Sequence, residues 1–269
     1  MTIPPFDFVR RYCMFLHEAT YDLDELARFN LHCHTHFSNC AKREMTVENI
    51  IKEAERCGLE MLSLNDHILS PDELEQHFGN NEQLRKEVEA TGTKIKVLIG
   101  GEFSAYDTDK YTLRFADEKF KPDYRLYAAN HYHVEAWHRP EDRSPDGFKE
   151  HMTGVLTCLF NEKAADCIAH PIYGGYSARF LDEKYGHEVA TVGKAWSDNE
   201  LGDIMQLGHE SGCAWELNRG AVLGDPEFFR RMFNIGREIG VVFNFGTDAH
   251  SIADIDTRKN LDEVKRVLL

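Results

Sequence analysis

The chain has 269 residues, which is enough for one large domain with a full hydrophobic core. Hydrophobic residues make up 42%, charged residues 29%, and the formal net charge is −15, so composition argues against membrane-spanning, collagen-like, disordered and disulfide-scaffold proteins. The acidic balance also argues against a nucleic-acid partner. The start of the chain lacks a secretory pattern, and the 7 cysteines form no C-x-x-C pair, so we expect reduced thiols and a cytoplasmic location.

Seven short apolar runs predict β-strands, because each is brief and is followed by polar or glycine-containing sequence. They span 29–32, 60–64, 96–99, 126–129, 167–169, 213–217 and 241–245. The stretches 107–123, 139–147 and 173–193 are predicted as loops, and residues 1–28 as a helical N-terminal extension of a single domain, 1–269.

Capping signals place helices in several of the intervals between these runs. The predicted helices are 47–57 between Thr46 and Gly58, one opened by Ser70-Pro71-Asp72-Glu73, 201–210 after the capping box Ser197 to Glu200, and 227–239 between Asp225-Pro226 and Gly240. Strands that alternate with helices indicate an α/β fold with a mostly parallel sheet. Seven such units suit a barrel near the size of the (β/α)8 fold, and an open doubly wound sheet is the alternative.

Histidines and acidic residues follow the ends of the predicted strands. In chain order they are His32, His34 and His36; Asp66 and His67; Glu102; His131 and His133; His170; Glu216 and Asn218; and Asp248 and His250. The carboxyl ends of parallel strands open onto one face, so these side chains should converge on one pocket. The other histidines, such as His77, are interpreted as surface or packing residues.

The spacing within three of these groups has a physical meaning. In an extended segment, residues two apart point to the same side, as in His32/His34, His131/His133 and Asp248/His250. Imidazoles combined with carboxylates suit Zn²⁺, Mn²⁺ or Fe²⁺. The donors outnumber those that one tetrahedral ion uses, and Glu102 could bridge two ions, so we predict two or three divalent metal ions.

These residues also occur in motifs that resemble those of the PHP (polymerase and histidinol phosphatase) family, in the family's order. The motifs are L-H-C-H-T at 31–35, S-N-C at 38–40, N-D-H at 65–67, G-E at 101–102, A-H-P at 169–171 and G-T-D-A-H at 246–250. The resemblance implies a distorted (β/α)7 barrel with metals at its C-terminal face. It assigns His32, His34, Glu102 and Asp248 to one ion, His67 and His250 to a second, and Glu102, His131 and His170 to a third.

Two positions depart from the family pattern or leave its alignment open. Many members place a metal-binding histidine where this chain has Cys40, whose thiolate could bind zinc or whose side chain could simply pack. His133 could substitute for His131. The segment Glu216-Leu217-Asn218 resembles the family's E-x-N strand, and we predict that these two polar residues, with Asp66, brace the ligands.

A phosphate group on a substrate would require a cation that donates a fork of hydrogen bonds. Arg179 and Arg219 follow the fifth and sixth strands and are the candidates, with Lys42 and Arg43 in reserve. For each arginine, a surface ion pair is the alternative.

The function that the sequence indicates is metal-dependent hydrolysis of a small phosphate monoester by a metal-activated water, without a protein nucleophile. Three other activities stay open: histidinol-phosphate phosphatase specifically, a nuclease-type phosphodiesterase, and an amidohydrolase-type C–N hydrolase. A non-enzyme with structural metals is the last alternative, although sites at a barrel mouth are usually open. We expect no membrane partner. The oligomeric state cannot be read from the sequence.

Overall fold

All seven runs predicted as strands form strands in the computed structural model, which describes residues 18–107, 110–111, 121–135 and 137–269. They are β1 (Phe29–Cys33), β2 (Met61–Leu64), β4 (Lys96–Ile99), β7 (Arg125–Ala128), β8 (Cys167–Ala169), β9 (Ala214–Asn218) and β10 (Phe243–Gly246). Three further strands, β3 (His67–Ile68), β5 (Gly101–Asp107) and β6 (Lys110–Tyr111), were not predicted. Of the predicted N-terminal extension, 1–17 lies outside the described residues, and α2 (Leu23–Leu26) is a short helix capped by Asp22.

The strands form two hydrogen-bonded sheets, in the orders β1-β2-β4 and β10-β9-β8-β7-β5-β3. Every pairing is parallel except that of β5 with β6. Two residues separate β2 from β3, and Gly100 alone separates β4 from β5, so each pair is one bent strand shared by both sheets. A side chain at Gly100 would place its Cβ 2.3 Å from the Tyr124 carbonyl oxygen, so this bend requires glycine.

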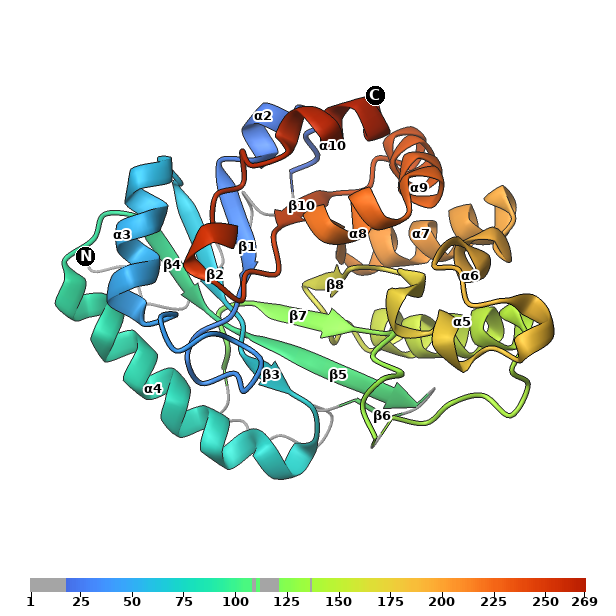
Figure 1. Cartoon of the computed structure of the whole chain (residues 1–269), viewed down its shortest axis with the longest axis horizontal. Coiled ribbons are helices and arrows are strands. Elements are labelled where there is room, and N and C mark those ends of the chain that lie inside the picture. Colours follow the sequence, from blue (N-terminus) through green and yellow to red (C-terminus); the bar gives the residue numbers. More distant parts are fainter. Residues whose placement is uncertain (1–17, 108–109, 112–120, 136) are drawn as a thin grey trace.

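Backbone contacts between the first and last strands close the sheet. The His34 amide donates to the Ala249 carbonyl at 3.0 Å, and the Ala249 amide donates to the His32 carbonyl at 3.3 Å. With this junction, the described strands form a distorted (β/α)7 barrel, as predicted, rather than an open sheet. Figure 1 shows the strands in the middle, with α3 and α4 on the left and α5 to α9 on the right.

The helices begin and end mostly where the capping residues predicted. They are α3 (Val47–Cys57), α4 (Leu74–Thr91), α5 (Pro145–Asn161), α6 (Ala190–Lys194), α7 (Asp198–Ser211), α8 (Arg219–Gly224), α9 (Pro226–Ile239) and α10 (Leu261–Leu268). Thr46 caps α3, Ser197 and Glu200 form a capping box on α7, and Asp225 caps α9. None of the helices among the described residues is long and apolar enough to cross a membrane.

Three local predictions were wrong. Ser70 makes no side-chain cap, because residues 71–73 form a 3-10 turn and α4 begins only at Leu74. The predicted loop 139–147 contains the start of α5, which Ser144 caps through the Gly147 amide. The predicted loop 173–193 contains three 3-10 turns and most of α6, and 107–123 falls largely outside the described residues.

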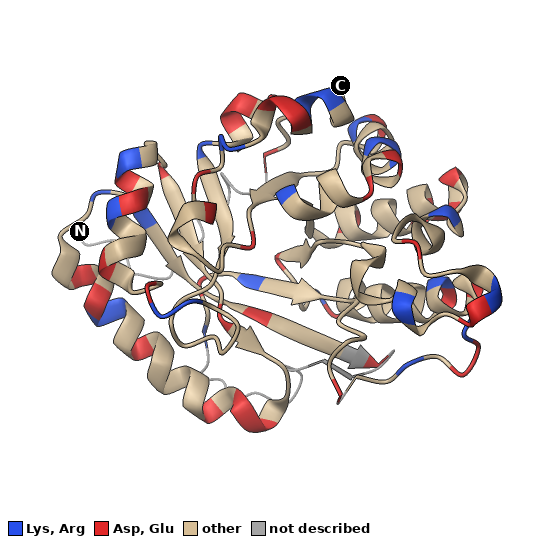
Figure 2. Ribbon diagram, in the orientation of Figure 1, with Lys and Arg blue, Asp and Glu red and all other residues tan. Residues whose placement is uncertain are grey.

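Along the strands, the side chains inside the barrel change from apolar to charged. One apolar cluster draws its buried members from β1, β2, β4, β7, β8 and β9 and forms the floor of the barrel; they include Leu31, Leu98, Leu126, Cys167 and Ala214. Glu102 is the register partner of Leu126, and Glu216 lies two residues beyond Ala214, so both carboxylates point into the same interior. Figure 2 shows most of the other charged segments on the outer helices and loops, while the strands are largely uncharged.

Candidate metal centre

Glu102 lies at the middle of a group of histidines. Its Oε2 atom is 2.8 Å from His67 Nδ1, 3.6 Å from His32 Nε2 and 3.7 Å from His34 Nε2. Its Oε1 atom is 2.9 Å from His170 Nε2 and 3.2 Å from His131 Nε2. One carboxylate therefore contacts five imidazoles, four of them from other strands or strand ends.

The position of Glu102 differs from the one predicted. It does not follow a strand end but is the second residue of β5, because the strand that begins as β4 continues past Gly100. Its direct register partner on β3 is His67, which explains why the two side chains meet.

Asp248 forms the second anionic contact of the group. Its Oδ1 atom lies 2.9 Å from His34 Nε2 and 3.3 Å from His32 Nε2. Asp248 and His170 both have positive φ, 53° and 29°, which is rare for residues with side chains and costs about 1–3 kcal/mol each. Strained backbone at two candidate ligands is typical of functional sites.

Glu216 braces two of these histidines at once. Its Oε1 is 2.8 Å from His32 Nδ1, and its Oε2 accepts a hydrogen bond from the His170 amide at 2.5 Å. Asn218 donates to the same Oε2 at 3.4 Å. A Cβ at Gly246 would lie 2.0 Å from Glu216 Oε1, so only glycine at this position of β10 leaves room for the contact.

Asp66 lies outside the histidine group and organises the loop that follows β1. It accepts hydrogen bonds from the Thr35 amide at 2.7 Å, the Thr35 hydroxyl at 2.6 Å and the Ser38 hydroxyl at 2.6 Å. Ser38 is in turn 3.2 Å from His34 Nδ1, so Asp66 acts on that ligand through a serine.

The histidine group is more exposed to solvent on the side of His67 and His250. The side chains of His67 and His250 are 23% and 32% exposed, whereas those of His32, His34, Glu102, His131 and His170 are at most 2% exposed. The Cys40 sulfur lies 3.1 Å from His250 Nε2. As candidate metal ligands, we call His32, His34, Glu102, His131 and His170 the inner ligands, and Cys40, His67 and His250 the outer ligands.

The carboxylates of Glu102 and Asp248 are held in their charged form. Burial opposes ionisation of Glu102, but His131, His67 and His32 outweigh it and hold the pKa of Glu102 well below its usual range. The same balance lowers the pKa of Asp248. Burial and the neighbouring His67 lower the pKa of His34 to about 4, which leaves its imidazole neutral and available as a ligand at neutral pH.

The donor atoms fit divalent metal ions. Within the described part of the chain, His32 Nε2, His67 Nδ1 and Glu102 Oε2 are buried and make no well-aligned hydrogen bond, which buried polar atoms rarely tolerate. Three overlapping groups have ligand atoms within 4.8 Å of one another: His34, His67 and His250; His32, His34 and Asp248; and His67, Glu102 and His131. Imidazole and carboxylate are the donors that Zn²⁺, Mn²⁺ and Fe²⁺ share.

Several predicted candidates lie away from this group. His131 rather than His133 contacts Glu102; the exposed His133 packs its ring 4.9 Å from that of Tyr176. The His36 ring packs on Phe37. Arg179 is exposed, and its guanidinium lies over the Phe180 ring. Burial, the neighbouring His131 and the charge of Arg179 together lower the pKa of His133 to about 4.

The remaining basic candidates differ in their surroundings. Lys42 and Arg43 are exposed on the loop after β1. Arg219 is buried, and its guanidinium donates to the carbonyls of Asp256 and Asp254 at 2.8 and 3.2 Å. Its donors are therefore directed at the chain segment before α10.

Two residues beside the centre were missed from the sequence. Asn130 Oδ1 is 3.1 Å from His170 Nδ1, and its Nδ2 donates to the His170 carbonyl at 3.0 Å. The Tyr176 ring lies 4.9 Å from that of His170 and 5.4 Å from that of His131. Asn130 follows the strand-end rule that identified its neighbour His131, whereas no pattern singles out Tyr176 in a segment without periodicity.

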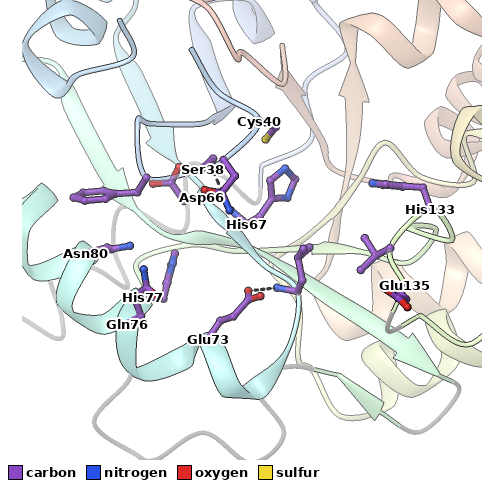
Figure 3. Close-up of a pocket in the computed structure, with 14 residues that line it drawn as sticks. Ser38, Cys40, Asp66, His67, Glu73, Gln76, His77, Asn80, His133 and Glu135 are labelled. Atoms are coloured by element: carbon purple, nitrogen blue, oxygen red, sulfur yellow. Dashed lines mark hydrogen bonds between the residues drawn. The ribbon is translucent and has the colours of Figure 1, made fainter. Parts of the chain in front are cut away.

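A cavity of about 520 Å³ adjoins the outer ligands, and Figure 3 shows Cys40 and His67 on its wall. The rest of the wall mixes the apolar side chains of Phe37, Leu69 and Val134 with polar ones, which include Ser38, Asp66, Glu73, Gln76, His77, Asn80, His133 and Glu135. No lysine or arginine is among the described residues that line it. A cavity of this size suits a small molecule.

Comparisons with known proteins identify a matching family model and similar solved structures. The family model for the PHP domain matches residues 30–196, which contain all the ligands except Asp248 and His250. Among solved structures, the chain is similar to a histidinol phosphate phosphatase (HisK) from Lactococcus lactis subsp. lactis, complexed with zinc, L-histidinol and phosphate. The two are 17% identical with a TM-score of 0.57, over 89% of this chain and 93% of that one.

A second similar structure is that of a candidate histidinol phosphatase, HisK, from Listeria monocytogenes. It is 12% identical with a TM-score of 0.56, over 84% of this chain and 97% of that one. These two likenesses show a shared fold. A comparison with curated proteins found no match.

Proposed function

This chain belongs to the PHP domain family, which makes it a metal-dependent hydrolase of phosphate esters, and we propose that it acts on small phosphate monoesters. One observation carries the proposal: a buried group of histidines and carboxylates opens into a cavity of about 520 Å³. The group supplies ligands for metals, and the adjoining space suits the alcohol part of a small ester.

We assign His32, His34, Glu102 and Asp248 to one ion. His67 and His250 are assigned to another ion. The remaining ion would bind His131 and His170 and share Glu102 with the first. Two or three divalent ions of zinc, manganese or iron would bind. Bound divalent ions supply a water of lowered pKa and neutralise charge that develops on phosphoryl oxygens.

The protein's own contribution is to orient the ligands. Glu216 accepts a hydrogen bond from His32 Nδ1, and Asn130 Oδ1 accepts one from His170 Nδ1, so that both Nε2 atoms present a lone pair to the centre. The side chains of Glu102 and Asp248 hold negative charge that balances the ions. No side chain of the chain needs to act as a nucleophile.

The charges on the cavity wall help to choose among the alternative activities. A nuclease requires cations along the path of the phosphate backbone, and the described lining residues include no lysine or arginine. Its wall instead carries Glu73 and Glu135, which would favour a substrate with a positively charged amino group. Histidinol phosphate is of this kind, so histidinol-phosphate phosphatase is the second candidate function.

The direct test is hydrolysis of a panel of phosphomonoesters, phosphodiesters and amides with added Zn²⁺ or Mn²⁺. We expect phosphomonoesters to be cleaved with the highest kcat/KM, and histidinol phosphate to be included among the good substrates if the second candidate is correct. A faster rate on diesters or amides would overturn the proposal. Metal-stripped protein is the control and should be inactive until an ion is restored.

We also propose that the chain works in a reducing compartment. Among the described residues, Cys33, Cys40, Cys57, Cys167 and Cys213 form no disulfide. Alkylation of the unfolded chain without reductant should give adducts on all 7 cysteines. A disulfide detected by mass spectrometry would contradict this.

A further inference from the structure

The outer ligands include a sulfur atom that the fold holds in place. Cys40 lies on the loop after β1, and the amide of Lys42, two residues later, donates to the His250 carbonyl at 2.9 Å. The same loop is attached to the segment that carries His67, because the Ser38 hydroxyl accepts from the His67 amide at 3.3 Å. The sulfur is therefore fixed between two histidine-bearing segments rather than left on a free loop.

The spacing between donors suits shared coordination. Zinc binds sulfur at about 2.3 Å and imidazole nitrogen at about 2.0–2.1 Å, so two tetrahedral ligands of these kinds lie about 3.6 Å apart. The observed separation between Cys40 Sγ and His250 Nε2 is 3.1 Å. Independently of the sulfur, His34, His67 and His250 have ligand atoms within 4.8 Å of one another.

We propose that the outer site is a thiolate zinc site formed by Cys40, His67 and His250, with its open position facing the cavity. It rests on the metal centre of the proposed function and adds a donor of a different chemical class. Thiolate is a soft ligand that favours Zn²⁺ over Mn²⁺ or Mg²⁺, whereas the carboxylates of Glu102 and Asp248 accept all three. The two parts of the centre therefore differ in metal preference, and the outer part selects zinc.

The open position follows from where Cys40 lies. Cys40 is exposed and lines the cavity, as do His67 and Ser38. Figure 3 shows the sulfur and the His67 ring on the same side of this space. Three protein ligands with one free position are the arrangement of catalytic zinc sites, whereas structural sites are closed by four.

Cobalt spectroscopy tests the sulfur directly. The full chain is stripped with a chelator and titrated with Co²⁺, whose thiolate complexes have a charge-transfer band in the near ultraviolet. We expect the band in the wild type and in the control Cys158→Ser, whose cysteine is far along the chain on α5. Cys40→Ser should lose the band and keep the visible d–d bands of cobalt bound to histidines.

Metal competition provides the second readout. With equal Zn²⁺ and Mn²⁺, the wild type should retain zinc at the outer site, and Cys40→Asp should shift the zinc-to-manganese ratio toward manganese by at least about tenfold. Circular dichroism checks that both variants fold. An absent band in the wild type, a band that persists in Cys40→Ser, or an unchanged metal ratio in Cys40→Asp would each overturn the proposal.

These readouts do not depend on turnover, so the two proposals can fail separately. A protein that shows the sulfur-dependent band but cleaves no phosphomonoester retains the thiolate site and loses the proposed function. A phosphomonoesterase whose spectrum is unaffected by Cys40→Ser retains the function and loses the thiolate site.

Discussion

The inner and outer ligands of the metal centre are built differently. Four of the five inner ligands lie within strands or directly after them, their side chains are at most 2% exposed, and Glu216 and Asn130 fix two of their imidazoles. Of the outer ligands, Cys40 lies on a loop and His250 follows β10 by four residues, with its side chain 32% exposed. A buried, braced ligand set binds tightly and exchanges slowly, while an exposed one can exchange ions and admit substrate. We infer that the inner part holds its ions most tightly, while the outer part exchanges its ion more readily and meets the substrate.

The largest effect should come from the shared carboxylate. Glu102→Gln keeps the shape of the side chain but removes the charge that faces five imidazoles. We expect at least one ion to be lost and kcat/KM to fall by at least about a thousandfold, equivalent to about 4 kcal/mol. Elemental analysis and steady-state kinetics measure both. Glu141→Gln, an exposed site, is the matched control, and wild-type metal content in Glu102→Gln would refute the inner assignment.

Graded chelation should separate the two parts of the centre. Because the outer ligands are the exposed ones, we expect metal to leave in two steps, the first accompanied by partial loss of activity and the second by complete loss. Metal content against chelator concentration gives the steps. A single step in which all ions leave together would show that burial does not distinguish the two parts.

Removal of a brace should have a smaller effect than removal of a ligand. Glu216→Gln leaves one of its partners, His32 or the His170 amide, without a charged acceptor. We expect metal affinity to fall about 10- to 100-fold, with little change in the free energy of unfolding of the metal-free chain. Isothermal titration with Zn²⁺ measures this. A loss as large as that of Glu102→Gln would mean that Glu216 is itself a ligand.

The smallest effect on catalysis should come from the exposed Arg179, which we compare with the buried Arg219. Arg179→Ala should raise KM for a phosphomonoester about tenfold, because a charge-assisted hydrogen bond contributes about 1.5–3 kcal/mol. Arg219→Ala is the matched control: it should lower the free energy of unfolding by about 1–3 kcal/mol, since two partly buried carbonyls lose their donor, and leave KM unchanged. If only Arg219→Ala raises KM, the two roles are reversed.

The sequence predicted the strands and the convergence of most inner candidate ligands, because the same rule about parallel strands covers both. Apolar runs identify the strands, and parallel strands bring their ends to one face, so His32, His34, His131 and His170 could be placed together from their positions alone. The rule misplaced Glu102, since it did not foresee that one strand would bend at Gly100 and continue. Bends depend on close contacts such as that of Gly100 with the Tyr124 carbonyl, which arise only when the barrel closes.

Loop residues show where sequence reasoning stops. The direction of the Arg219 donors toward Asp254 and Asp256, and the packing of Tyr176 over His170, depend on how distant segments meet. The association of Cys40 with His250 depends on a backbone hydrogen bond across the barrel junction. No local pattern encodes such contacts.

Anomalous X-ray diffraction from crystals grown with zinc tests the whole arrangement most directly. We predict one strong peak between His32, His34, Glu102 and Asp248, and a weaker, more easily exchanged peak beside Cys40, His67 and His250. Absence of any peak within reach of Glu102 would contradict the assignment of this group of side chains as a metal centre.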